Sequence, residues 1–156
     1  MPDHYKAMEE VVKVLTHPEM GVLKNLAEIE AVGHRVLHGG ERFIRPVLID
    51  KEVEEAIEEY AIFGPLHNPS NLAGIRAAKA HLPNIPHVAV FDTAFHSTMP
   101  PHAYIYALPY ELYEKYHIRR YGFHGSSHYY VSMRAMKYLQ EQFGIPPLES
   151  KIITCH

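Results

Sequence analysis

The chain has 156 residues, 47% of them hydrophobic, and a formal net charge of −3 at pH 7 with histidines counted as neutral. This length suits one domain, or one domain with part of another, and the apolar fraction excludes a disordered composition. No Lys/Arg cluster stands out and no apolar stretch approaches transmembrane length, so neither a nucleic acid nor a membrane is expected as a partner. The single cysteine, Cys155, excludes an internal disulfide framework. With no hydrophobic signal region near the N-terminus, it favours the cytoplasm.

The first third of the chain predicts a helix, a buried strand and a second helix. Asp3 is expected to cap a helix ending near Val14, in which apolar residues recur with a period near 3.6. Residues 29–37 are mostly apolar and run into two glycines, which is typical of a buried strand followed by a loop. Asp50 is expected to cap an amphipathic helix over 51–62.

The middle of the chain continues this alternation. Asn68 is expected to be the N-cap of a helix that has proline at its first position and ends at Leu82. A short apolar strand over 86–91 then ends at Asp92. Strands that alternate with helices favour an α/β fold with a largely parallel sheet, in which ligands bind at the carboxyl ends of the strands.

The last third begins with an irregular, tyrosine-rich stretch to Tyr116. Ser126 or Ser127 is expected to cap a helix that continues to Phe143 and is ended by glycine and proline. The residues expected on its buried side are Val131, Ala135, Tyr138 and Leu139. Residues 151–156 are expected to return to strand.

Two charged residues lie where such a sheet would bind a ligand. Arg35 is flanked by apolar residues, so its charge is costly to bury unless an anion pairs with it; a solvent-exposed strand-edge position is the alternative. Asp92, at the end of a strand, could hold Mg²⁺ or orient a nucleophile, or it could only cap the next helix. The glycines after 38 could likewise form a simple turn.

Two histidine pairs are spaced four residues apart, His34 with His38 and His124 with His128. On a helix this spacing can bind zinc, which makes a zinc hydrolase an alternative. The glutamate that follows the first histidine of a metalloprotease is absent from both pairs, so the zinc alternative has little support and no metal ligand is assigned.

Five motifs together resemble the acetokinase family over essentially the whole chain. In order they are G-H-R-x-x-H-G-G-E, P-L-H-N-P, V-F-D-T-A-F-H, Y-G-F-H-G-S-S-H and I-T-C-H, at positions 33–41, 65–69, 90–96, 121–128 and 153–156. The fold that the resemblance implies is a partial actin-like, ribonuclease-H-like ATPase fold. The reaction that it implies is reversible phosphoryl transfer between ATP and acetate with Mg²⁺, giving acetyl phosphate and ADP.

The resemblance also implies roles for individual residues. Arg35 would grip the acetate carboxylate, Asp92 would position acetate or the metal, and His124 would hydrogen-bond the transferring phosphoryl group. The acetate methyl would lie against Leu37, Leu66 and Phe123, with His67 as structural support nearby. Valine is commoner in the family at the position of Leu37, and threonine at that of Ser126.

Some family features do not occur in this sequence. These include an N-x-G-S-S-S-x-K phosphate loop, the L-G-N-G turn after I-T-C-H, the adenosine pocket and a glutamate serving Mg²⁺. The resemblance therefore implies an internal piece of a kinase, with 1–98 as the rear of the first domain and 99–156 as the start of the second. We expect this piece to be inactive by itself. Family members form homodimers, a state that these residues do not support. A propionate or butyrate kinase and a non-catalytic carboxylate-binding module remain alternatives.

Overall fold

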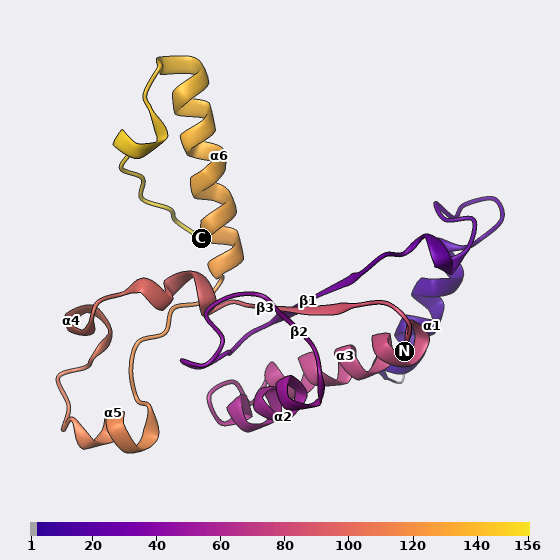
Figure 1. The fold of residues 1–156 in the computed structure, drawn as a ribbon, viewed down its shortest axis with the longest axis horizontal. Helices are drawn as coiled ribbons and strands as arrows, with labels where there is room; N and C mark the ends of the chain where they lie inside the picture. The colour runs from indigo at the N-terminus through magenta and orange to yellow at the C-terminus, as the bar shows by residue number, and fades with distance from the viewer. Residues whose placement is uncertain (1–2) are drawn as a thin grey trace.

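The computed structural model describes residues 3–156 and shows a small sheet with helices on one face (Figure 1). The sheet has three strands in the order β1-β3-β2; β1 and β3 are parallel, and β2 is antiparallel to β3. The strands are β1 (Val32–Val36), β2 (Val47–Leu48) and β3 (His87–Phe91). The α-helices are α1 (His4–Leu15), α2 (Lys51–Glu59), α3 (Asn68–His81), α4 (Pro101–Tyr104), α5 (Glu111–Tyr116) and α6 (Gly125–Phe143). Short 3-10 helices lie at η1 (Leu26–Glu28), η2 (Tyr60–Ile62), η3 (Ala94–Thr98) and η4 (Pro147–Glu149).

The hydrophobic core lies between the sheet and helices α2 and α3. Along β3, buried residues alternate with half-buried ones, so Ala89 and Phe91 share the buried face while Val90 points the other way. The Phe91 ring stacks on Phe43 with centroids 4.7 Å apart and planes 4° from parallel. Val36, at the end of β1, is fully buried beside them. This packing fixes the carboxyl ends of β1 and β3 side by side.

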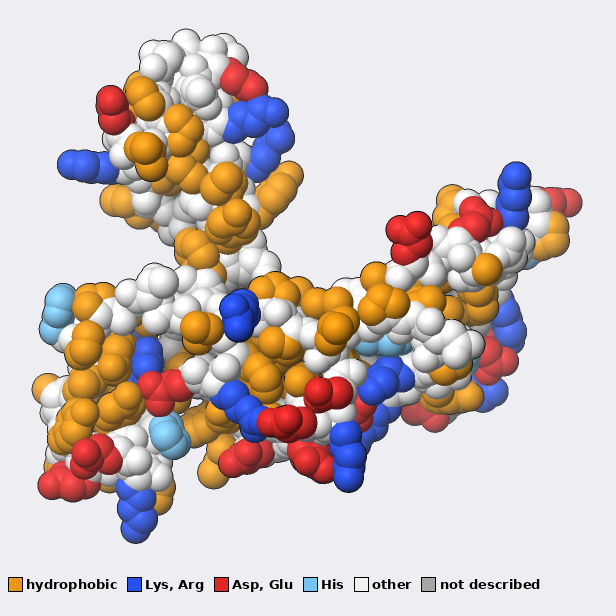
Figure 2. Space-filling model, viewed as in Figure 1, with side chains coloured by type: hydrophobic (Ala, Val, Ile, Leu, Met, Phe, Trp, Pro, Cys, Tyr) orange, Lys and Arg blue, Asp and Glu red, His pale blue; other side chains and the backbone are white. Residues whose placement is uncertain are grey.

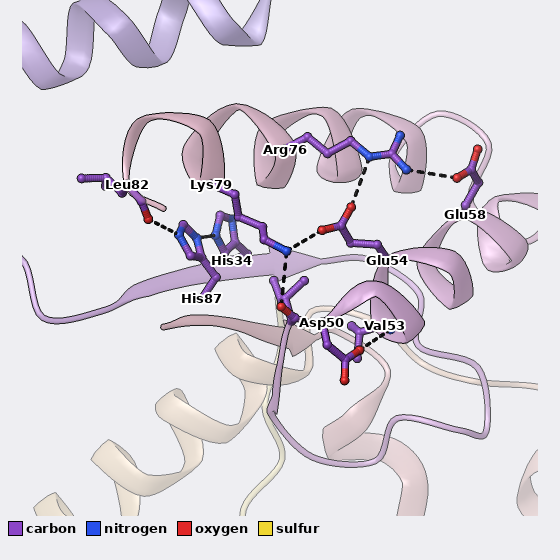
Figure 3. Close-up of polar contacts among 10 residues, drawn as sticks. His34, Asp50, Val53, Glu54, Glu58, Arg76, Lys79, Leu82 and His87 are labelled. Atoms are coloured by element: carbon purple, nitrogen blue, oxygen red, sulfur yellow. Dashed lines mark hydrogen bonds and ion pairs between the residues drawn. The ribbon is translucent and has the colours of Figure 1, made fainter. Parts of the chain in front are cut away.

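Charged side chains hold α2 against α3 beside this core (Figure 3). Glu54 of α2 accepts hydrogen bonds from Lys79 at 2.7 Å and from Arg76 at 3.3 Å, both on α3. On the same side of the sheet, the rings of His34 and His87 share a hydrogen bond of 2.9 Å, and His87 Nε2 donates to the Leu82 carbonyl. The helix pair and strands β1 and β3 therefore form one connected unit.

Two of the expected helix caps are confirmed and two are wrong. Asp3 accepts a hydrogen bond from the Lys6 amide and Asp50 from the Val53 amide, as expected of N-caps. Asn68 does not cap α3: it is fully buried and its side chain faces the loop after β1, so His67 takes the N-cap position without a side-chain bond. Neither serine caps α6, because His124 is the residue before its first turn.

Helix α6 rises away from the sheet, and its expected buried side is wrong in part (Figure 1). Val131 is 44% exposed and Tyr138 is 59% exposed, whereas Ala135 and Leu139 are half-buried. Figure 2 shows apolar side chains gathered over this projecting part of the molecule. Residues 151–156 form no strand; they run back along α6 and are held by the Thr154 hydroxyl, 2.7 Å from His128 Nδ1.

Residues 99–124 leave the core, form α4 and α5, and return to it. Glu41, in the loop after β1, accepts a 3.0 Å hydrogen bond from the Tyr113 hydroxyl and pairs with His117 and Arg119. Partial burial opposes ionisation of Glu41, but the hydrogen bonds from Arg119, His117 and Tyr113 outweigh it and lower the pKa of the carboxyl. The Glu41 carboxylate thus links residues 99–124 to the loop after β1. A domain boundary at residue 98 stays a prediction.

No helix among residues 3–156 combines the length and hydropathy needed to cross a bilayer.

Candidate functional site

Arg35 and Asp92 meet at the carboxyl ends of the two parallel strands. Arg35 Nη2 lies 2.7 Å from Asp92 Oδ2, and Arg35 Nε lies 3.1 Å from Oδ1 and 3.3 Å from Oδ2. Register explains the meeting, because Arg35 is paired with Val90 and Asp92 follows two residues later on the same face of the sheet. These hydrogen bonds raise the pKa of the guanidinium, against a smaller opposing effect of burial.

Asp92 also fixes the start of α6. Its backbone amide donates to Val36 O at 2.9 Å, its carbonyl accepts from the Gly125 amide at 3.0 Å, and its Oδ2 accepts from the His124 amide at 3.3 Å. Gly125 is required here because a Cβ at that position would lie 2.3 Å from the Asp92 carbonyl oxygen. The contact holds His124 in the left-handed region, at φ 53°, which is uncommon for a residue other than glycine.

One pocket of about 540 Å³ gathers all but one of the residues that the resemblance singled out. Its lining includes Arg35, Leu37, Leu66, His67, Phe123 and His124. Asp92 does not line it but lies behind Arg35, 2% exposed. The pocket therefore has a cationic end at Arg35 and an apolar remainder.

The six lining residues are not equally enclosed. Leu66 is 83% exposed and His67 is also exposed, so they form the rim. Phe123 is 40% exposed, and its ring packs edge-on against His38 with centroids 5.7 Å apart. Leu37 is half-buried, and its amide donates to Asn71 Oδ1 at 3.0 Å. Leu37 is therefore the more enclosed apolar surface of the pocket, and Phe123 is the more open one.

Three lining residues were missed by sequence reasoning, namely Phe63, Gly64 and Pro65. Pro65 is the first residue of the P-L-H-N-P motif and the other two directly precede it, so their place in and beside that motif is the signal that could have found them. Phe63 stacks on His38 with centroids 5.1 Å apart, so this wall of the pocket rests on the buried His38 ring. Gly64 is buried.

Asn68 organises the backbone beneath the pocket. Its Oδ1 accepts from the His38 amide at 3.1 Å, and its Nδ2 donates to the carbonyls of His38 and Ile57, each at 3.1 Å. The loop after β1 is thereby joined to α2 and α3. A buried amide whose bonds are all satisfied holds this loop in one position.

His38 is enclosed by aromatic rings and is 1% exposed. Its Nδ1 accepts a 3.1 Å hydrogen bond from the Gly40 amide, so the ring is neutral with its hydrogen on Nε2. Burial lowers the pKa of His38 to about 4. His38 is thus a neutral structural group at the base of the site.

Asp92 and His128, two potential metal ligands, are already bonded to other protein groups. Within residues 3–156, no three His, Cys, Asp or Glu side chains are placed to hold a metal ion. Both oxygens of Asp92 are taken by Arg35 and the His124 amide, and His128 bonds Thr154. With both of its oxygens bonded in this way, Asp92 is placed to orient Arg35.

The chain is similar to known proteins along its whole length. The model of the acetokinase family matches residues 1–156. Acetate kinase of Thermotoga maritima is 58% identical over 156 residues, and acetate kinase of Caldicellulosiruptor saccharolyticus is 56% identical over 154. The chain is covered to 100% and 99% in these matches but spans only 38% of either relative.

Solved structures give the same relationship. The crystal structure of Porphyromonas gingivalis acetate kinase matches with a TM-score of 0.83 and 52% identity, over 89% of this chain and 35% of that one. A propionate kinase from Francisella tularensis matches with a TM-score of 0.80 and 46% identity, over 88% and 35%. These matches confirm the expected partial α/β ATPase fold. The chain belongs to the acetokinase family.

Proposed function

We propose that this chain forms the carboxylate-binding part of a short-chain carboxylate kinase, which transfers a phosphoryl group between ATP and acetate. The observation that carries the proposal is the pocket in which Arg35 and His124 flank an apolar wall, with Asp92 fixed behind Arg35. The family relationship supports the reaction type. Because the chain spans 38% of its curated relatives, the activity, ATP, Mg²⁺ and any homodimer are proposed for the longer protein.

Arg35 is suited to hold the substrate carboxylate. Asp92 occupies Nε and Nη2, whereas Nη1 forms no hydrogen bond within residues 3–156. A carboxylate that enters the pocket can accept hydrogen bonds from Nη1 and Nη2, which together form the end-on edge of the guanidinium. Asp92 meanwhile keeps the guanidinium from rotating. The substrate methyl then faces Leu37 and Phe123.

His124 is suited to meet the group that is transferred. In the proposed reaction a carboxylate oxygen attacks the γ-phosphorus in line, the bond to the bridging oxygen of ADP breaks, and ADP leaves with those electrons. The backbone of His124 is held by the hydrogen bond from its amide to Asp92 Oδ2, and its ring donates to an equatorial oxygen as charge spreads over the phosphoryl group. One such preorganised donor is worth about 10²–10³ in rate. Positioning and charge stabilisation account for most catalysis of this type.

Calorimetry and an activity assay test the proposal together. Acetate titrated into the 156-residue chain should bind, and Arg35→Ala should abolish the heat. Arg134→Ala is the matched control, because Arg134 is an exposed arginine on α6 outside the pocket. On the longer protein, titration with nucleotide and a hydroxamate assay with ATP, Mg²⁺ and acetate then separate a kinase, which needs both ligands, from a module that binds only the carboxylate. Acetate heat that survives Arg35→Ala would contradict the proposed site.

A further inference from the structure

Gly64 lies where the pocket meets the start of α3, and its backbone is fixed. Its amide donates to Ala61 O at 3.2 Å, and its carbonyl accepts from the amides of His67 at 3.0 Å and Asn68 at 2.9 Å. The residue is buried and lines the same pocket as Arg35. Its φ is not positive, so the backbone itself does not demand glycine here.

Space, not backbone conformation, accounts for the glycine. A Cβ at position 64 would lie 2.9 Å from Leu37 Cδ2 and 3.3 Å from Asn68 Oδ1. The Leu37 side chain therefore rests directly on the bare Cα of Gly64. The tip of Leu37 thus occupies space that a Cβ at position 64 would need, and both residues line the pocket.

If a methyl group were added at position 64, Leu37 is the neighbour that would move. Asn68 is held by bonds to His38 and Ile57, and the backbone of Gly64 is held on both sides. The Leu37 side chain is apolar and has no hydrogen bond to hold it. Leu37 is only half-buried and its free side lines the pocket, so a displaced Cδ2 enters the space open to a ligand.

We propose that Gly64 is a specificity-determining residue that sets the length of the acyl chain. Because position 64 has no Cβ, the Leu37 side chain can pack against its Cα. The pocket then has room for an aliphatic carboxylate longer than acetate, of propionate to butyrate length. This inference rests on the proposed function, since it takes the carboxylate end to lie at Arg35. Each buried methylene then adds about fourfold in affinity.

Binding measurements on the 156-residue chain test this with acetate, propionate and butyrate. The native chain should bind propionate and butyrate more tightly than acetate. In Gly64→Ala the propionate-to-acetate affinity ratio should fall by about fourfold or more, which cancels that gain. The double variant Leu37→Val/Gly64→Ala should recover it, because the shorter side chain gives back the lost space. Gly74→Ala is the control: it lies on α3 outside this pocket, and its added Cβ would meet only His4 at 3.9 Å.

A second readout does not depend on ligand. In a chain with labelled leucine methyls, Gly64→Ala should shift the Leu37 resonances and Gly74→Ala should not. If Gly64→Ala does not fold, Leu37→Ala provides the same test from the other side, and should raise the butyrate-to-acetate ratio. Carboxylate binding with ratios unchanged in these variants would overturn the role of Gly64 and leave the proposed function standing. If no carboxylate binds the native chain, both proposals fail.

Discussion

The Arg35 guanidinium lies edge-on to the Asp92 carboxylate, with Nη2 2.7 Å from Oδ2, although the two side chains are 59% and 2% exposed. Only the arginine of this pair is therefore open to solvent. A ligand can contact the guanidinium while the Asp92 carboxylate stays buried. Since a single exposed ion pair adds little to stability, the value of this pair lies in aiming the guanidinium and in satisfying a buried carboxylate.

Replacement of Asp92 tests this relationship. Asp92→Asn keeps the shape but removes the charge and one acceptor, so Arg35 and the His124 amide lose a shared partner. We expect unfolding in urea to show a loss of about 1–3 kcal/mol, and acetate to bind more weakly. Glu52→Gln is the control, since Glu52 pairs with Arg42 at an exposed site and should cost less than about 0.5 kcal/mol. Equal losses in the two variants would contradict the role given to Asp92.

Asn68→Ala should strongly destabilise the folded chain. The change leaves the His38 amide and the carbonyls of His38 and Ile57 without partners in a buried place. We expect a loss of about 2–4 kcal/mol in the free energy of unfolding. Asn84→Ala, at an exposed position after α3, is the comparison and should have little effect. A small loss for Asn68→Ala would mean that water replaces the amide.

His38 should make stability depend on pH. Its pKa in the folded chain is about 4, below its ordinary value of 6.5, so between these values the unfolded chain binds more protons. The contribution of the neutral ring to the free energy of unfolding is fully present above pH 6.5. It decreases by roughly 3 kcal/mol in total as the pH falls towards 4. Urea unfolding between pH 4 and 7.5 measures this. His38→Gln should flatten the dependence; an unchanged slope would assign it to other groups.

Glu41 should control the order of residues 99–124. Glu41→Gln removes the charge that Arg119 and His117 share, and it weakens the bond from Tyr113. Amide hydrogen exchange in α5 should quicken by about tenfold, since each charged hydrogen bond contributes roughly 1–3 kcal/mol. Exchange in α3 should not change. Glu59→Gln, an exposed glutamate at the end of α2, serves as the control. Faster exchange in both helices would instead indicate a global loss of stability.

Sequence could predict the features that depend on neighbouring residues. Asp3 and Asp50 cap their helices because the amide that each one binds is three residues away. Asn68 follows the same local pattern, but its side chain finds partners 30 and 11 residues back along the chain, which a local rule cannot see. Gly64 was missed for a similar reason, because its importance comes from Leu37, which belongs to a different element.

The faces of α6 and the residues after it show a second limit. A helical period marks which residues lie together, but burial requires something to pack against them. Val131 and Tyr138 are exposed because no described element covers that side of α6. Residues 151–156 likewise have strand composition but no strand beside them. The convergence on one pocket was expected from the family resemblance; the roles of Arg35, Asp92 and His124 stay predictions.

The attachment of α6 has a mechanical consequence. The helix has 19 residues and extends about 28 Å, yet its first turn is tied to the body by the bonds of Asp92 to His124 and Gly125. Such a lever turns about its fixed end, where displacement is smallest. A tilt of a few degrees would sweep the tip near Phe143 through ångströms while the imidazole at the pivot barely shifts. The far end of α6 can then move together with any group bound to it, while the position of His124 is preserved.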